Sequence, residues 1–126
     1  MQINVDEARP YWAHPSQHVM GSHPDNLPDH LEYWANGPVC LAFHRMPWPA
    51  VWMVHCGVKR DGLGQYVDPA RRILRAFADH TEAELITSWT AQSNRAVLAF
   101  AKRVGFTVDG ELSTKSNPLV MSSWRP

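Results

Sequence analysis

The uneven distribution of proline is the feature that most restricts how this chain can fold. Seven of its ten prolines lie in residues 1–49, at Pro10, Pro15, Pro24, Pro28, Pro38, Pro47 and Pro49. Proline lacks a backbone N–H donor and fixes φ, so long helices are not expected there. We therefore expect residues 1–38 to form a proline-rich N-terminal segment. It would contain one short helix around Pro28 to Ala35, ended by the pair Asn36-Gly37.

Two strands joined by a tight turn are expected directly after that segment. Val39 to His44 and Ala50 to Val58 are rich in apolar and β-branched residues, and the residues between them have the composition of a turn. A turn centred on Trp48 would place Cys40 opposite Cys56 in a hairpin. A disulfide would then be within reach, although two free buried thiols are the more common outcome in a reducing compartment.

The second half of the chain alternates helices and strands. Asp68 as N-cap and Pro69 at the first helical position predict a helix start, and the apolar residues after them recur at helical spacing: Ala70, Ile73, Leu74 and Phe77. A second amphipathic helix is expected to begin at Gln92 or Ser93 and to end at Gly105.

Three more strands are expected, over residues 84–90, 106–112 and 118–124. The order of elements predicts an α/β (α+β) fold in which helices pack on one sheet. A chain of 126 residues has the size of a single domain. We therefore expect one domain over residues 1–126, with its core in residues 39–124.

Composition argues against several classes of function. Lys plus Arg and Asp plus Glu are both 12, so the formal net charge is zero and no nucleic-acid partner is expected. No apolar run is long enough to span a membrane, and the first residues lack the pattern of a secretory signal. Two cysteines make no disulfide framework, so a cytoplasmic protein is expected.

The segment from Asn94 to Phe106, NRAVLAFAKRVGF, combines an asparagine, an amphipathic helix and a Gly-Phe pair at a fixed interval. It resembles a motif of the GNAT N-acetyltransferase superfamily, and the order of elements over residues 39–124 is similar as well. The resemblance implies a mixed, mostly antiparallel sheet with helices on both faces. It also implies that the sheet opens between the strands at 50–58 and 84–90 and holds acetyl-CoA there.

The resemblance further implies which residues would hold this cofactor. In the family, backbone N–H groups of a loop and of the following helix N-terminus bind the pyrophosphate, because unpaired N–H groups and the helix dipole favour an anion. In this chain Arg60, Gly62, Gly64 and Gln65 would lie in that loop. Asn94 would contact the pantetheine arm or the phosphates.

Two departures from the family pattern bear on catalysis. Asp68 would place a carboxylate beside the pyrophosphate, and Pro69 removes one backbone donor. Many members carry a tyrosine general acid seven residues after the motif asparagine, where this chain has Ala101. Either another group, such as Tyr66, protonates the departing thiolate, or the chemistry is lost.

His55 is the candidate general base. It lies mid-strand, where the family often carries a base, and an imidazole with a pKa near 6.5 suits the role. The alternative is a core histidine satisfied by one hydrogen bond. No metal site is expected, because the spacings of His14, His18, His23 and His30 are those of surface loop residues rather than of a ligand set.

Six tryptophans are many for a small core. Trp52 and Trp89 lie in expected strands and should be buried. Trp48 stands between two prolines and is either an exposed interface anchor or folded back on its own sheet.

Two functions remain open. The first is an acyl-CoA-dependent N-acyltransferase that moves an acetyl group directly to an unknown amine, in the cytoplasm (that of the host if a bacteriophage encodes it). The second is a catalytically inactive GNAT-fold module, a structural part of a bacteriophage head or tail. With its compact GNAT-like domain, proline-rich start and altered cofactor loop, the chain resembles the small acetyltransferase-like proteins of tailed bacteriophages. Such a module would lie in the virion and would bind copies of itself or a phage structural protein through an apolar patch on its own surface.

Overall fold

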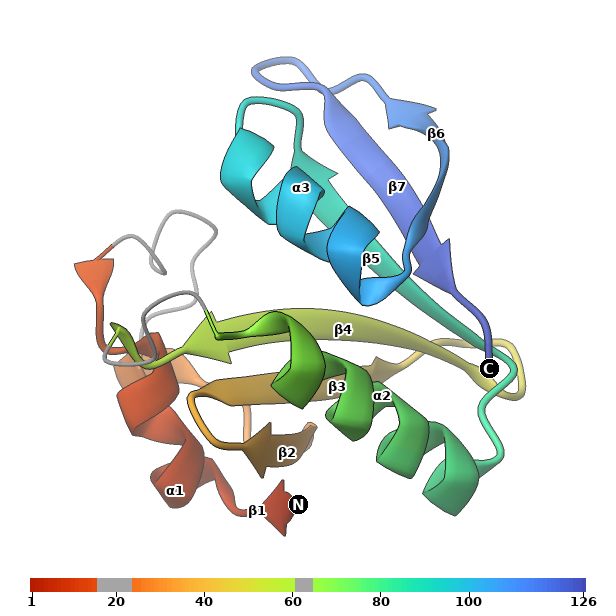
Figure 1. Cartoon of the computed structure of the whole chain (residues 1–126). Coiled ribbons are helices and arrows are strands. Elements are labelled where there is room, and N and C mark those ends of the chain that lie inside the picture. Colours follow the sequence, from red (N-terminus) through yellow and green to blue (C-terminus); the bar gives the residue numbers. More distant parts are fainter. Residues whose placement is uncertain (16–23, 61–64) are drawn as a thin grey trace.

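The computed structural model describes residues 1–15, 24–60 and 65–126 (Figure 1). Its elements in chain order are β1 (Gln2–Ile3), α1 (Val5–Ala8), the 3₁₀ helices η1 (Arg9–Trp12) and η3 (Pro24–Asn26), β2 (Glu32–Asn36), β3 (Val39–Arg45), β4 (Val51–Val58), α2 (Val67–Thr81), β5 (Leu85–Ala91), α3 (Arg95–Val104), β6 (Thr107–Leu112) and β7 (Leu119–Trp124). No helix in these three described ranges is long and apolar enough to cross a membrane.

The strands form one seven-stranded sheet in the order β1-β2-β3-β4-β5-β7-β6. Every neighbouring pair is antiparallel except β4 and β5, which are parallel. The mixed, mostly antiparallel sheet is therefore confirmed. The parallel pair needs a crossover, and α2 supplies it.

Helix α2 covers one face of the sheet because its apolar residues recur at helical spacing. Phe77 stacks flat on Phe43, with ring centroids 3.6 Å apart, and meets Trp34 and Trp52 edge-on. Helix α3 contacts α2, and the Arg71 guanidinium donates a 2.6 Å hydrogen bond to the Arg103 carbonyl. The two helices thus share one core.

The N-terminal residues cover the opposite face. Asn4 and Glu7 form a reciprocal capping box that starts α1. Trp12 of η1 is only 2% exposed and meets Tyr33 of β2 edge-on, with ring centroids 6.0 Å apart. A Cβ at Gly57 would lie 2.6–2.8 Å from the indole ring of Trp12, so the indole packs directly on the β4 backbone. Helices on both faces are confirmed.

The expected helix over residues 28–35 is wrong, because Glu32–Asn36 is strand β2. It pairs with β1 on one side and β3 on the other. Tyr33 and Trp34 alternate between the two core clusters, which is the two-residue period of a strand. Asn36 is the last residue of β2, and Gly37-Pro38 forms a hairpin turn rather than a helix stop, with Gly37 providing the positive φ of 55°.

The predicted β3–β4 hairpin is confirmed, but its register is wrong by one residue. Cys40 pairs with Gly57, and Cys56 pairs with Leu41. The reason is that the turn, residues 47–50, has an even number of residues. It is closed by a 3.0 Å hydrogen bond that the Met46 N–H donates to the Val51 carbonyl. Cys40 faces the N-terminal cluster and Cys56 faces the α2 core, so both thiols are free.

The two helix starts also differ from expectation. Helix α2 begins two residues earlier than predicted, with Tyr66 as N-cap, so Asp68 lies in the first turn. Helix α3 begins at Arg95 with Asn94 as N-cap, and Gly105 ends it as predicted, with φ of 118°. The left-handed C-cap explains why glycine stands there.

The tryptophans divide between core and surface. Trp52 is buried as predicted, and Trp48 is 67% exposed, so it is not folded back on its own sheet. The prediction for Trp89 is wrong, since it is 44% exposed. Ile86 of the same strand belongs to the α2 core, and three residues later the strand directs Trp89 to the opposite face.

Candidate functional site

The parallel strands β4 and β5 separate along their length. Their pairing covers only Val51–Leu85, Trp52–Ile86 and Met53–Thr87, although β4 continues to Val58 and β5 to Ala91. Beyond this point β4 remains paired with β3, and β5 remains paired with β7. The sheet therefore opens between β4 and β5 (Figure 1). The opening predicted between strands 50–58 and 84–90 is confirmed.

Backbone groups of β4 line this opening. The Met46 N–H bonds to the Val51 carbonyl and the Lys59 N–H to the Pro38 carbonyl, so odd-numbered β4 residues direct their backbone groups toward β3. Because these directions alternate along a strand, Val54 and Cys56 direct theirs toward β5, where the strands have parted. Two N–H donors therefore point into the opening.

His55 lies between these two residues and points to the face covered by η1. It pairs with Ala42 on β3, and the residue keeps part of its surface exposed. Desolvation by the surrounding protein, and next the neighbouring His44, lower the pKa of His55 below the usual 6.5. The imidazole is therefore neutral at neutral pH and able to accept a proton.

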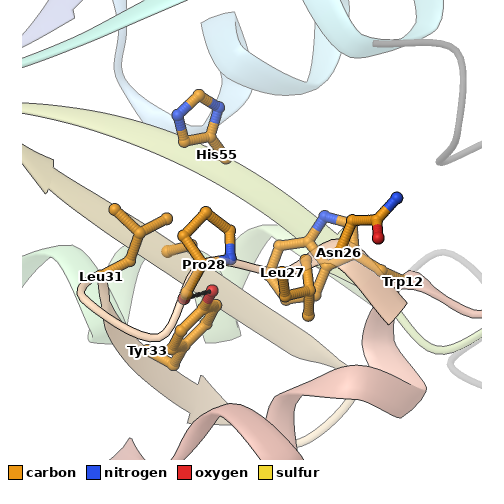
Figure 2. A pocket seen from close by; sticks show the side chains of 8 residues that line it. Trp12, Asn26, Leu27, Pro28, Leu31, Tyr33 and His55 are labelled. Atoms are coloured by element: carbon orange, nitrogen blue, oxygen red, sulfur yellow. Dashed lines mark hydrogen bonds between the residues drawn. The ribbon is translucent and has the colours of Figure 1, made fainter. Parts of the chain in front are cut away.

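A cavity of about 180 Å³ opens beside His55. Figure 2 shows His55 set apart from a group of mainly apolar side chains, and the described lining residues are Trp12, Asn26, Leu27, Pro28, Leu31, Tyr33, Ala42 and His55. The Tyr33 hydroxyl donates to the Pro28 carbonyl, which holds the loop over the sheet. Burial raises the pKa of Tyr33 to about 12, so this hydroxyl stays protonated.

The start of α2 lies at the wide end of the opening, after β4. The Tyr66 hydroxyl donates to the Lys59 carbonyl at 3.3 Å, and its ring packs against the α2 core. The first helical hydrogen bond runs from Ala70 N–H to the Tyr66 carbonyl. Val67 and Asp68 therefore carry first-turn N–H groups without a helical partner, while Pro69 has no backbone N–H group.

The predicted cofactor residues lie in two loops at this wide end. Arg60 and Gln65 are exposed between β4 and α2, and Gly62 and Gly64 lie outside the described residues. Asn94 follows β5, whose end lies at the same edge because the two strands are parallel. Its side-chain oxygen accepts the Val97 N–H at 3.3 Å, so in this structure it caps α3.

The two predicted catalytic side chains are not brought together. His55 faces the N-terminal side of the sheet, whereas Tyr66 packs on the α2 side. Ala101 lies in α3 and its methyl group cannot transfer a proton. Sequence reasoning missed the cavity wall formed by Trp12, Leu27 and Tyr33, because no periodic pattern in the proline-rich segment marked these residues.

No metal centre is apparent within the described parts of the chain, where no three His, Cys, Asp or Glu side chains are grouped closely enough to hold an ion. Of the four histidines weighed as ligands, His18 and His23 fall outside those parts. His30 instead meets His44, with ring centroids 6.3 Å apart.

The fold is that of known acetyltransferases. The structure is similar to a GNAT-family acetyltransferase from Bacillus anthracis (TM-score 0.61, 9% identity, 70% of this chain and 58% of that one). It is also similar to the ribosomal-protein-S5-alanine acetyltransferase of Vibrio fischeri (TM-score 0.63, 10% identity, 75% and 61%). A third is the microcin C7 self-immunity acetyltransferase in complex with acetyl-CoA and AMP (TM-score 0.59, 13% identity, 71% and 54%).

The sequence comparisons are negative. No protein-family model matches the chain, and no curated protein matches its sequence. The chain spans about three fifths of the length of the first two structures. At these identities the likeness concerns the fold alone.

Proposed function

We propose that this protein is an acyl-CoA-dependent N-acyltransferase that transfers an acetyl group from acetyl-CoA to an amine. One observation carries the proposal: β4 and β5 part after Met53 and Thr87, with His55 beside the opening. Similar structures include acetyltransferases, two of them solved with acetyl-CoA. We place the reaction in the cytoplasm, in one domain over residues 1–126.

The opening suits the acyl-bearing arm of the cofactor better than its pyrophosphate. Outward N–H groups of Val54 and Cys56 can donate to amide or thioester oxygens. At the helix start, Val67 and Asp68 offer N–H groups, and Arg60 adds positive charge nearby in the chain. The Asp68 carboxylate opposes an anion at the same position, so pyrophosphate binding should be weak.

The chain's own residues supply the remaining chemistry. Acetyl-CoA, when bound, contributes an acyl group activated as a thioester, and the products with an amine are an amide and free thiol. Neutral His55 can accept the proton that an ammonium group must lose before its nitrogen becomes a nucleophile. The N–H groups of Val54 and Cys56 can stabilise an oxygen that gains negative charge.

Tyr66 has a structural role in this arrangement, because its hydroxyl bonds to Lys59 and its ring packs into the α2 core. We therefore assign no proton transfer to Tyr66: His55 accepts the proton of the ammonium group, and the departing thiolate takes the proton that the attacking nitrogen loses as the amide forms. A Tyr66→Phe variant should retain most of the activity, whereas His55→Gln should lose it.

Thermal unfolding with and without millimolar acetyl-CoA tests the proposal. A ligand at 100 times its Kd adds about 2.7 kcal/mol of stability. Asp68→Asn should enlarge the shift in Tm, because it removes a like charge from the anion site, and the matched variant Asp79→Asn in the last turns of α2 should not. No shift in the wild type or in Asp68→Asn would refute the proposal.

One observation favours the alternative, a catalytically inactive module such as a bacteriophage virion component. Trp89 and Leu112 are large apolar side chains exposed on the sheet face that α2 does not cover. Such a surface suits contact with another protein or a second copy. Sedimentation of the purified chain tests this function. A stable oligomer, together with no shift in Tm on addition of acetyl-CoA, would favour it.

A further inference from the structure

The cavity beside His55 has a lining whose chemistry restricts what it can bind. Six of its eight lining residues are apolar or aromatic, and the two remaining ones are Asn26 and His55. The Tyr33 hydroxyl is already used by the Pro28 carbonyl. The wall therefore offers apolar contact with very few hydrogen-bonding groups.

Among the residues that the structure describes, none that lines this wall is acidic. Asp29, next to the lining in the chain, is exposed, and after burial its negative charge is one of the causes that raise the pKa of Tyr33, so one carboxylate lies near this wall. A polyamine or another multiply charged cation needs anionic partners for each ammonium group, and the cavity does not supply them.

The volume also matches a particular size of ligand. An apolar cavity of about 150 Å³ is enough to bind benzene. The cavity here has about 180 Å³, which leaves room for a ring and a short chain. Figure 2 shows His55 apart from Leu31 and Pro28 in the lining of the cavity, and the terminal amine of such a ligand would lie at the His55 end.

From these observations we propose that the cavity takes a primary amine carried on a small apolar or aromatic group, an arylalkylamine being the simplest example, and does not take a polyamine. That the bound amine is an acyl acceptor rests on the proposed acyl transfer, but the binding of the amine in the cavity does not. An apolar wall disfavours the charged ammonium form, and His55 is placed to accept its proton.

Binding without acetyl-CoA tests the inference directly. We would titrate the protein with 2-phenylethylamine and, separately, with spermidine, and follow backbone amide shifts by NMR. Wild-type protein should bind 2-phenylethylamine at least about tenfold more tightly than spermidine, and the shifts should centre on Trp12, Tyr33 and His55. Equal or tighter binding of spermidine, or no binding of 2-phenylethylamine, would overturn the inference.

Matched leucine variants add a control. Leu27→Asp places a carboxylate in the wall, so it should strengthen binding of spermidine and reduce the preference for 2-phenylethylamine at least about fivefold. Leu112→Asp changes an exposed leucine on β6, away from the lining, and should leave both unchanged. If Leu27→Asp fails to fold, Leu27→Ala should still weaken binding of the aromatic amine; unchanged binding would contradict the inference.

Adding acetyl-CoA separates this inference from the proposed function. Binding of 2-phenylethylamine without release of free thiol would support the site and refute the acyl transfer. Thiol release with spermidine but not with 2-phenylethylamine would support the transfer and refute the inferred ligand.

Discussion

Gly57 on β4 and Trp12 of η1 form the contact that fixes the N-terminal residues against the sheet. A Cβ at position 57 would lie 2.6 Å from Cδ2, 2.7 Å from Cε2 and 2.8 Å from Cε3 of the indole. Ordinary carbon–carbon contacts are about 3.5–4.0 Å, so the ring would have to move by roughly 1 Å. Trp12 is 2% exposed and packs on Tyr33, so it has little space to move into.

We therefore expect Gly57→Ala to destabilise the protein by about 2 kcal/mol, within the range for an overpacked core. For a domain of this size that is a decrease in Tm of roughly 8 °C. Urea unfolding followed by circular dichroism would measure the free energy of unfolding. The control is Gly110→Ala, where the new Cβ would be 3.7 Å from the Met121 methyl group, an ordinary contact, so its effect should be within about 0.5 kcal/mol.

A double-mutant cycle tests the stated cause. In a Trp12→Leu background the same alanine should cost less than about 0.5 kcal/mol, because the large ring is gone. If Gly57→Ala were neutral in the wild type, or equally destabilising without the indole, the reasoning would be refuted.

Three further predictions concern individual side chains. Asn94→Ala should lower the free energy of unfolding by about 1 kcal/mol, because it removes the cap on the Val97 N–H, whereas Asn94→Ser should stay near wild type; equal urea midpoints for both variants would show that the cap is not important. The pKa of His55 is lower in the folded chain than in the unfolded chain, so the unfolded chain binds more protons and stability should decrease as pH falls below about 6.5. In His55→Gln, Tm should fall less between pH 7.5 and pH 5.5 than in the wild type, and an equal fall in both proteins would contradict this prediction. Burial raises the pKa of both Cys40 and Cys56 to about 12, so iodoacetamide should label neither thiol at pH 8 until the protein is unfolded, as mass spectrometry would show.

Much of the second half could be predicted because local chemistry specifies it. The stripe Ala70, Ile73, Leu74 and Phe77 can face a core only as a helix, and the structure places all four in the buried face of α2. Gly105 adopts the left-handed conformation that ends α3, which side chains other than glycine rarely tolerate. The strands at 39–45 and 51–58 follow from their β-branched and apolar content.

The candidate site was only partly accessible from the sequence. His55 could be singled out by its place in a strand, and the opening beside it through the family resemblance. The cavity wall could not be found, because Trp12, Leu27 and Tyr33 are brought to His55 by the path of a proline-rich segment that has no periodicity.

The remaining features depend on pairing between distant residues, which no local pattern reports. Residues 32–36 became a strand because β1 and β3 supply hydrogen bonds on both sides, and this overrode the helix expected there. One extra residue in the turn at Pro47–Ala50 shifted the register and sent Cys40 and Cys56 to opposite faces. The sequence by itself determined the order of elements and the helical faces; the tertiary structure decided which face each strand residue occupies, because that depends on register, and register is set by partners far away in the chain.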